Sequence, residues 1–89
     1  MAKSILQSER ECYFCGTTIR LDEHHVIHGT SNRANSERYG LKVYLCRKHH
    51  ELVHTDRKHD LLLKRAAQRE FEKTRTREEF RVIFGKSYL

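Results

Sequence analysis

A chain of 89 residues is long enough for one domain and too short for two. Only 37% of the residues are hydrophobic, 34% are charged and tryptophan is absent. A domain of this size and composition has a marginal core, so we expect disulfides, a metal or a partner to stabilise it. No stretch is long and apolar enough to be expected to span a membrane.

The three cysteines indicate a metal rather than disulfides. Cys12 and Cys15 are separated by two residues, Cys46 lies far from both, and an odd number cannot close a full disulfide framework. No signal peptide is evident, so we expect a reducing cytoplasm, where a Cys-x-x-Cys pair usually binds a metal. A redox pair is the alternative, but it is expected in a strand–loop–helix context without a histidine cluster.

The net charge is +6, and the surplus lies in the second part of the chain. Residues 57–89 hold ten Lys and Arg against five Asp and Glu, whereas residues 1–56 hold eight against seven. A basic segment beside a metal site favours a polyanionic partner, most simply nucleic acid. A helix that is merely well solvated is the alternative interpretation.

In chain order, residues 1–10 are predicted to form a short tail or an initial strand against the core. Residues 11–16 have the form of a zinc knuckle, in which a tight turn brings two thiolates to one ion. A strand is expected over 22–28, a polar loop over 29–38, and a second strand over 41–46, where apolar and polar residues alternate.

After the second strand the periodicity becomes helical. His50 and His54 stand one turn apart on a short helix, and a longer helix is expected over about 56–73, with an aspartate as its N-cap. Residues 76–79 form a capping-box pattern, so a last short helix should follow, and Gly85 is placed to end it. The prediction is an α+β domain.

A closed structural zinc site is predicted from four residues at suitable spacing: Cys12, Cys15, Cys46 and His49. The Cys-x2-Cys and Cys-x2-His halves of this pattern flank the expected hairpin, so the ion would tie the start of one strand to the end of the other. The alternative is that Cys46 is only a small buried apolar residue.

All seven histidines lie in the middle of the chain, and several remain after the zinc site is assigned. Neighbours on a helix point about 100° apart, so His49 and His50 do not easily serve one ion, whereas His50 and His54 share a face. A third ligand would come from the first strand, from His24 or His25. Three imidazoles can hold Zn²⁺, Ni²⁺, Mn²⁺ or Mg²⁺ and leave positions for water and phosphate.

The residues around these histidines resemble the HNH family of ββα-metal nucleases. The matching segments are 22–27, a polar loop with Asn32 and Asn35, and 45–54. The His-His pair followed by His-x3-His is similar to the DNase colicins. The cysteines are similar to those of zinc-finger-bearing phage and bacterial members, most narrowly small phage proteins related to the RecA-dependent nuclease Ref. The resemblance covers about 11–56, roughly half of the chain.

The resemblance implies a small ββα-metal (HNH) core with a zinc knuckle over 11–56. It implies an N-terminal tail over 1–10 and a basic helical segment over 57–89 that packs on the core. It further implies a phage- or prophage-encoded DNA-binding protein in the bacterial cytoplasm. A second copy of the chain, or a recombination or phage protein, is a candidate partner.

The family pattern also implies the roles of the histidines. His25 would be the general base that holds the attacking water, and the catalytic metal would be held by His24, His50 and His54. The expected function is endonucleolytic hydrolysis of DNA that leaves 5′-phosphate and 3′-hydroxyl ends. The alternative is a non-catalytic zinc-binding module for DNA or a protein partner, with these residues as a second structural metal site.

Two positions depart from a simple version of the pattern. Neighbouring side chains on a regular strand face opposite ways, so His24 and His25 reach one site only if the strand bends or ends there. Where the family carries its central Asn, this chain has Leu41; Asn35 is the favoured substitute for that catalytic role and Asn32 the second.

The remaining polar residues near the site are candidates for contacts with the substrate. His28 would face either a substrate phosphate or solvent. Contacts with the DNA backbone are expected from four basic residues that flank the site: Arg33, Arg38, Arg47 and Lys48.

Overall fold

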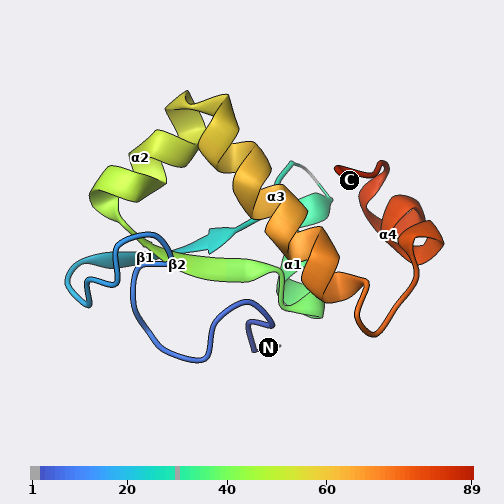
Figure 1. The fold of residues 1–89 in the computed structure, drawn as a ribbon, viewed down its shortest axis with the longest axis horizontal. Helices are drawn as coiled ribbons and strands as arrows, with labels where there is room; N and C mark the ends of the chain where they lie inside the picture. Colours follow the sequence, from blue (N-terminus) through green and yellow to red (C-terminus); the bar gives the residue numbers. More distant parts are fainter. Residues whose placement is uncertain (1–2, 30) are drawn as a thin grey trace.

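The computed structural model describes residues 3–29 and 31–89. Its elements are, in chain order, β1 (Leu21–His25), α1 (Asn32–Tyr39), β2 (Lys42–Cys46), α2 (Arg47–Thr55), α3 (Arg57–Phe71) and α4 (Arg77–Phe84). The two strands form one antiparallel sheet. Helices α2 and α3 lie on one side of this sheet, and α4 lies at the far end of α3 (Figure 1). The described residues therefore form an α+β fold in which helices cover one side of a two-stranded sheet.

The hairpin is close to its prediction, but its first strand is shorter. Strand β2 covers most of the predicted stretch, and its register pairs Leu21 with Cys46 and His25 with Lys42. Strand β1 ends at His25 rather than at residue 28. Val26 and Ile27 continue beyond the strand as a fully buried bend, and Val26 N–H donates to the Leu41 carbonyl over 2.9 Å. The early end of β1 makes His25, paired with Lys42, the last residue of the strand.

Residues 29–38 were predicted to be a loop, and that prediction is wrong, because α1 begins at Asn32. The helix has no apolar stripe, and Ser36 is its one buried residue among those described. Ser36 Oγ donates to the Ile27 carbonyl over 2.6 Å and accepts from Ile27 N–H over 3.2 Å. Gly40 ends the helix with φ of 73°. Tertiary hydrogen bonds, rather than amphipathic periodicity, therefore stabilise this helix.

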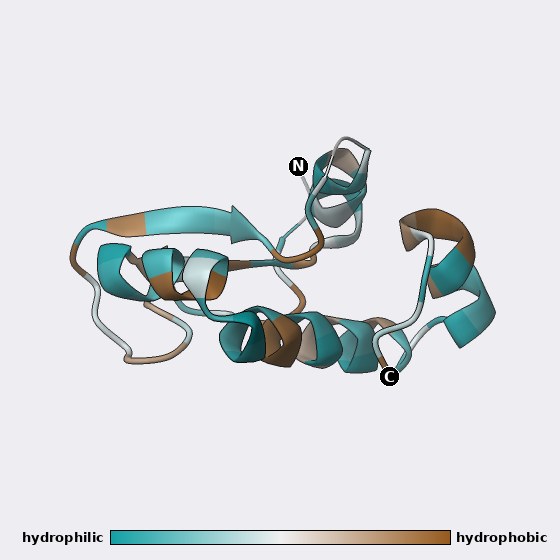
Figure 2. Ribbon diagram, turned by 90° about the horizontal axis from the view of Figure 1, so that it is seen from above, coloured by the Kyte–Doolittle hydropathy of each residue, from teal (hydrophilic) through white to brown (hydrophobic). Residues whose placement is uncertain are grey.

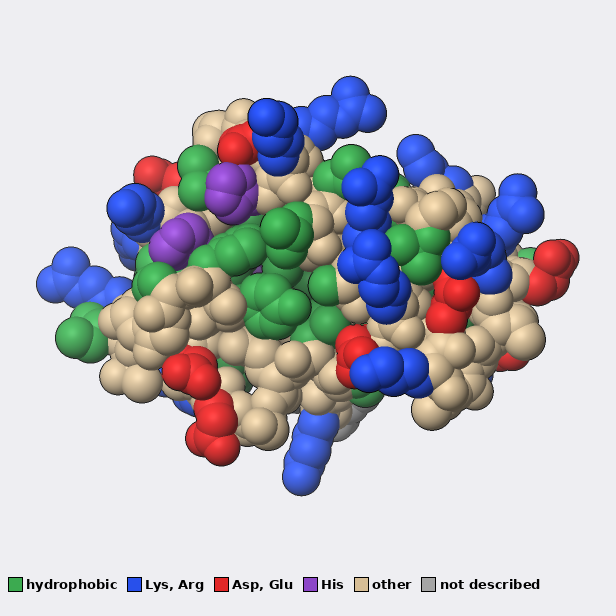
Figure 3. Space-filling view, in the orientation of Figure 1, with side chains coloured by type: hydrophobic (Ala, Val, Ile, Leu, Met, Phe, Trp, Pro, Cys, Tyr) green, Lys and Arg blue, Asp and Glu red, His purple; other side chains and the backbone are tan. Residues whose placement is uncertain are grey.

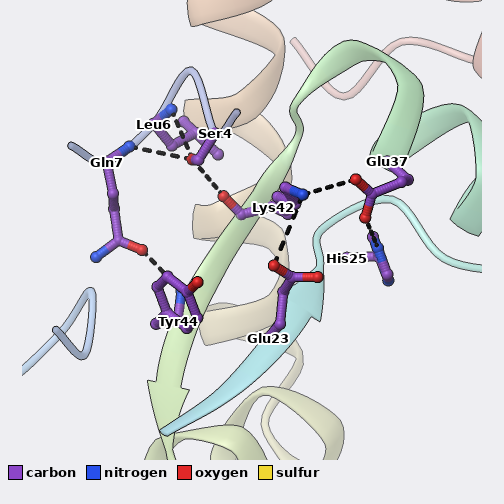
Figure 4. Close-up of polar contacts among 8 residues, drawn as sticks. All are labelled: Ser4, Leu6, Gln7, Glu23, His25, Glu37, Lys42 and Tyr44. Carbon is purple, nitrogen blue, oxygen red and sulfur yellow. Dashed lines mark hydrogen bonds and ion pairs between the residues drawn. The ribbon is translucent and has the colours of Figure 1, made fainter. Parts of the chain in front are cut away.

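The described part of the N-terminal segment is a tail without strand structure. It runs beside β2: Ile5 N–H donates to the Gly40 carbonyl over 2.9 Å, and the Gln7 side-chain oxygen accepts from Tyr44 N–H over 2.7 Å (Figure 4). Ser4 Oγ donates to the Lys42 carbonyl over 2.5 Å. These bonds satisfy polar groups at the outer edge of the sheet, which would otherwise be open to pairing with another chain.

The core lies between the sheet and α3, and it extends to α4. Leu63, Ala67 and Phe71 form the buried stripe of α3, which Figure 2 shows as a second layer beneath the sheet. Phe80 and Phe84 of α4 join this stripe, with the Phe71 and Phe80 ring centroids 5.3 Å apart. Both C-terminal helices are confirmed, α3 within the predicted range and α4 with its predicted start and end.

The caps of these helices are those that the sequence indicated. The Asp56 side chain accepts from Lys58 N–H at the start of α3. Thr76 and Glu79 form the reciprocal capping box of α4, and Gly85 ends α4 in a left-handed conformation. Among the described helices, none combines the length and the apolar character needed to cross a membrane.

Candidate metal centres and active site

Three sulfurs and one imidazole meet where the knuckle turn, the end of β2 and the first turn of α2 come together. The ligand atoms of these residues lie within 4.8 Å of one another: Cys12, Cys15, Cys46 and His49. His49 Nδ1 lies 3.5 Å from Cys12 Sγ and 3.2 Å from Cys46 Sγ. Cys15 Sγ lies 3.9 Å from Cys46 Sγ. The structure thus groups the four residues that the spacing indicated, in an arrangement that could hold a metal ion.

These separations are compatible with zinc. In a tetrahedral site with Zn–S bonds of about 2.3 Å and Zn–N bonds of about 2.1 Å, two sulfurs lie about 3.8 Å apart, and a sulfur and a nitrogen about 3.5 Å. The three separations given above differ from these edges by a few tenths of an ångström. The sulfurs are also not paired with one another, because all three cysteines are free thiols.

Backbone hydrogen bonds hold the knuckle in place. Cys12 N–H donates to the Thr17 carbonyl over 2.8 Å, and Gly16 N–H donates to the Cys12 carbonyl over 2.9 Å. Gly16 has φ of 76°, which a residue with a side chain rarely adopts. Tyr13 N–H donates to the Tyr44 carbonyl and so fastens the turn to β2. Two ligands are therefore presented by a local turn and two by the hairpin–helix junction.

The cysteine acidities suit a site for a cation. Burial alone raises the pKa of the Cys12 thiol, but hydrogen bonds from the backbone of Cys46, Cys15 and Phe14 outweigh it and lower that pKa to about 6. Thr17 lowers the pKa of Cys15, but burial and the neighbouring sulfurs of Cys12 and Cys46 outweigh this effect and raise it. Burial and the neighbouring sulfurs thus disfavour the Cys15 thiolate, and a bound cation would favour it.

A second cluster is formed by three histidines, one from β1 and two from α2. The ring of His24 lies 5.3 Å from that of His50 and 5.6 Å from that of His54, and the His50 and His54 rings are 4.9 Å apart. One nitrogen from each ring lies within 4.8 Å of the others. His50 therefore faces away from the cysteines, although its neighbour His49 faces them.

One buried nitrogen of this cluster lacks a hydrogen-bond partner among the described residues. His24 is 4% exposed, and its Nε2 is buried without a hydrogen-bond partner among the described residues. Burial, together with the nearby His50, His54 and His28, lowers the pKa of His24 to about 4 against the opposing effect of Asp60. The ring is thus neutral at physiological pH. A buried, neutral and unpartnered imidazole nitrogen is well suited to bind a metal.

Asp22 supports the cluster from β1, two positions before His24. Its Oδ2 lies 3.1 Å from His50 Nδ1, which leaves Nε2 of His50 for a ligand. Metal-binding histidines usually donate their other N–H group to a carboxylate or carbonyl, which fixes the ring and its tautomer. No role was predicted for Asp22, although an acidic residue two positions before a histidine pair is a usable signal.

His25 ends β1 and contacts a different set of residues from His24. Its Nε2 lies 3.0 Å from Glu37 Oε1 of α1. Lys42 Nζ lies 2.6 Å from Glu37 Oε2 and 3.6 Å from Glu23 Oε2 (Figure 4). Glu23, His25 and Glu37 are close enough to form a ligand group, but the Lys42 ammonium already contacts both carboxylates. This group is therefore better described as an ion-pair network than as a metal centre.

Both histidines of the pair nevertheless border one surface hollow of about 270 Å³. The hollow is smaller than the sites that usually enclose drug-sized ligands, and its size suits a small polar group. It is lined by charged and imidazole side chains: Glu23, His24, His25, His28, Arg33, His50 and His54. His25 is the last residue of β1, and it lines the hollow together with its neighbour His24.

The two candidate asparagines have hydrogen-bond partners on another element. Asn35 Nδ2 donates to the Ile83 carbonyl over 3.1 Å, and Asn32 Nδ2 donates to the Phe84 carbonyl over 3.4 Å. Both amides thus tie α1 to the last turn of α4. The side chain that contacts His25 is Glu37, for which the sequence carried no local signal because α1 was not expected.

The basic candidates are distributed over several surfaces. Arg33 borders the hollow, and the Arg38 guanidinium lies 5.7 Å from the ring centre of Tyr39. Arg47 and Lys48 occupy the first turn of α2, where both are exposed or nearly so. His28 Nε2 lies 3.4 Å from Asp60 Oδ1, beside the second cluster. Only Arg33 and His28 of these residues are brought to the hollow.

Comparisons of the chain with protein-family models, with curated proteins and with solved structures give no match.

Proposed function

We propose that this chain is a metal-dependent HNH endonuclease that hydrolyses DNA phosphodiester bonds. Strands β1 and β2 with helix α2 would form its ββα-metal core. The observation that carries the proposal is the common hollow of the three-histidine cluster and His25. A ligand set with an unpartnered buried nitrogen and a separate imidazole at the same opening is the combination that metal-assisted hydrolysis requires.

The catalytic metal would be held by His24, His50 and His54. This assignment is supported by the orphaned Nε2 of His24 and by the contact of His50 Nδ1 with Asp22. A divalent cation there would stabilise the negative charge that develops on the phosphate and on the departing 3′ oxygen. Asp22 would hold the His50 ring in position from outside the ligand set.

His25 would act as the general base. Its Nδ1 takes a proton from the attacking water while the water oxygen bonds to phosphorus. The bond from phosphorus to the 3′ oxygen breaks, and that oxygen leaves with the bonding pair and takes a proton from solvent. A histidine suits this role because the usual imidazole pKa lies near physiological pH.

DNA would be held mainly through its phosphates. Arg33 borders the hollow and is the best placed of the four basic candidates to contact the phosphate that is cleaved. Figure 3 shows Lys and Arg side chains spread over the face of α2, α3 and α4, with acidic side chains between them. A dispersed positive surface of this kind favours contact with the DNA backbone over recognition of bases.

The Cys12, Cys15, Cys46 and His49 site would hold a structural zinc. All four positions are protein ligands, so the ion would have no open coordination site for a substrate. It would instead fix the knuckle to the β2–α2 junction and thereby orient α2. Because α2 also carries His50 and His54, the structural ion would set the position of the catalytic site without contacting it.

Plasmid cleavage with purified protein tests the proposal. The metal content is first measured by mass spectrometry, and supercoiled DNA is then incubated with Mg²⁺, Mn²⁺, Ni²⁺ or Zn²⁺. We expect conversion to nicked or linear DNA with at least one metal, and loss of this activity in His24→Ala and His54→Ala. DNA binding without cleavage under every metal condition would instead favour a non-catalytic zinc-binding module.

A further inference from the structure

The carboxylate of Glu37 in α1 contacts His25, the proposed general base, although the two residues are distant in sequence. Glu37 Oε1 lies 3.0 Å from His25 Nε2, and the two residues are twelve positions apart. The side chains of His25 and Glu37 are 27% and 28% exposed, so the contact is partly sheltered from water. A charge-assisted hydrogen bond in such a place is stronger than the same contact at an open surface.

The charge of Glu37 determines which partner donates. Hydrogen bonds from His25 and Lys42 lower the pKa of the Glu37 carboxyl, so it is ionised at neutral pH and can only accept. His25 Nε2 therefore carries the shared hydrogen. In the neutral ring Nδ1 is then an acceptor, and no group within residues 3–29 and 31–89 donates a hydrogen bond to it.

Lys42 holds the carboxylate in place from the opposite side. Its Nζ lies 2.6 Å from Glu37 Oε2 and 3.6 Å from Glu23 Oε2, and the residue is 7% exposed. The two oxygens of Glu37 thus bind two different partners, which restricts rotation of the carboxylate (Figure 4). Burial alone lowers the pKa of Lys42, but Glu37 and Glu23 outweigh it and raise that pKa, so the ammonium stays charged.

We propose that Glu37, held by Lys42, is a positioning residue that keeps His25 in the Nε2–H tautomer with Nδ1 free to receive the proton of the attacking water. The inference rests on the proposed nuclease function. It assigns to the Glu37 side chain the orienting role that the family resemblance would give to an asparagine, because Asn35 and Asn32 donate to carbonyls of α4 instead.

The test compares Glu37→Ala and Glu37→Gln with the control variant Glu78→Gln. Glu78 is an exposed residue of α4, so the control makes the same change from carboxylate to amide away from the site. We expect kcat to fall about 10–100-fold in Glu37→Ala, as for other residues that orient a functional histidine. A smaller fall is expected in Glu37→Gln, whose amide can pair with either tautomer. KM and bound zinc of Glu37→Gln should match those of the control.

A spectroscopic measurement separates positioning from a purely structural role. Long-range ¹H–¹⁵N spectra of the zinc-loaded protein should show His25 as the Nε2–H tautomer in the wild type and as a mixture in Glu37→Gln. An Nδ1–H tautomer in the wild type would overturn the proposal. If Glu37→Ala does not fold, Glu37→Gln still decides, because it leaves a polar oxygen for Lys42.

The outcomes for the two proposals differ. If the wild type cuts DNA and Glu37→Gln cuts at the rate of Glu78→Gln with an unchanged His25 spectrum, only the positioning role is overturned. If the wild type cuts with none of the four metals, the nuclease function is overturned, and the role of Glu37 in it falls as well.

Discussion

His49 and His50 are consecutive residues of α2, yet their rings belong to different clusters. His49 Nδ1 lies 3.2 Å from Cys46 Sγ, and the ring centre of His50 lies 5.3 Å from that of His24. The rotation of about 100° between neighbours on a helix is the cause, since it sends adjacent side chains to different faces. One helical turn thus contributes to two potential metal centres.

This arrangement predicts opposite metal losses in two adjacent variants. We expect His50→Ala to retain one zinc per chain and lose the metal of the histidine cluster. His49→Ala should lose the structural zinc and destabilise the fold, because three thiolates remain without their fourth partner ligand. Metal stoichiometry and thermal unfolding of the purified variants measure both effects. Retention of zinc and fold in His49→Ala, with unfolding of His50→Ala, would mean that His50 is the fourth zinc ligand.

Removal of the structural metal should unfold the protein. A site assembled from residues 12–49 does not pre-exist in the unfolded chain, so binding energy of the ion contributes directly to folding. We expect a chelator, or either of Cys12→Ser and Cys46→Ser, to give an insoluble or molten product. Circular dichroism and bound zinc are the measurements, with His54→Ala as a control that leaves the cysteines intact. Near-native unfolding of a zinc-free variant would refute the structural role.

Loss of the proposed base should separate cleavage from binding. His25→Ala leaves both metal clusters intact, so we expect normal metal content and DNA affinity. Its cleavage rate should fall by about 10²–10⁴, the usual contribution of a positioned general base. Single-turnover cleavage and gel-shift binding measure the two properties. A variant that cleaves at the wild-type rate would show that another group activates the water.

Substitution of Asn35 distinguishes a structural role of its side chain from a catalytic one. Its amide donates to the Ile83 carbonyl, so Asn35→Ala should lower the free energy of unfolding by about 1 kcal/mol, the typical net value of such a bond. Asn32→Ala, which removes a longer bond of 3.4 Å to Phe84, should cost less. Denaturant unfolding checks both, and the cleavage rate per folded molecule should not change. A rate that falls with Asn35→Ala but not with Asn32→Ala would support the predicted catalytic role of Asn35.

DNA affinity should depend steeply on salt. Contacts with phosphates release counterions, so log K falls linearly with log salt in proportion to the number of contacts. We expect Arg33→Ala to reduce the magnitude of this slope by about one and to weaken binding to all sequences alike. Fluorescence anisotropy over a series of salt concentrations gives the slopes. Affinity that does not change with salt would show that the basic residues of α3 and α4 form only a solvated surface.

The sequence by itself determined the features that depend on short-range spacing. The Cys-x2-Cys and Cys-x2-His pattern predicted the grouping of Cys12 with His49, and the His-x3-His spacing placed His50 and His54 on one face. The caps and apolar stripes predicted α3 and α4. Within the helices and within each half of the zinc pattern, the decisive residues lie within about one or two turns of one another, so local geometry relates them before any tertiary contact forms. The two halves of the zinc pattern, with Cys12 and His49 37 positions apart, come together only in the folded chain.

Only the tertiary structure decided what surrounds His25. Helix α1 is polar on all sides, and it is held by bonds such as Ser36 to Ile27 and Asn35 to Ile83, which span nine and 48 positions of the chain. Because no periodicity marks such bonds, the sequence predicted a loop there and missed Glu37. The end of β1 at His25 likewise depends on the buried bend that follows it. Hydrogen bonds between distant segments form only once packing excludes water, and spacing along the chain does not report them.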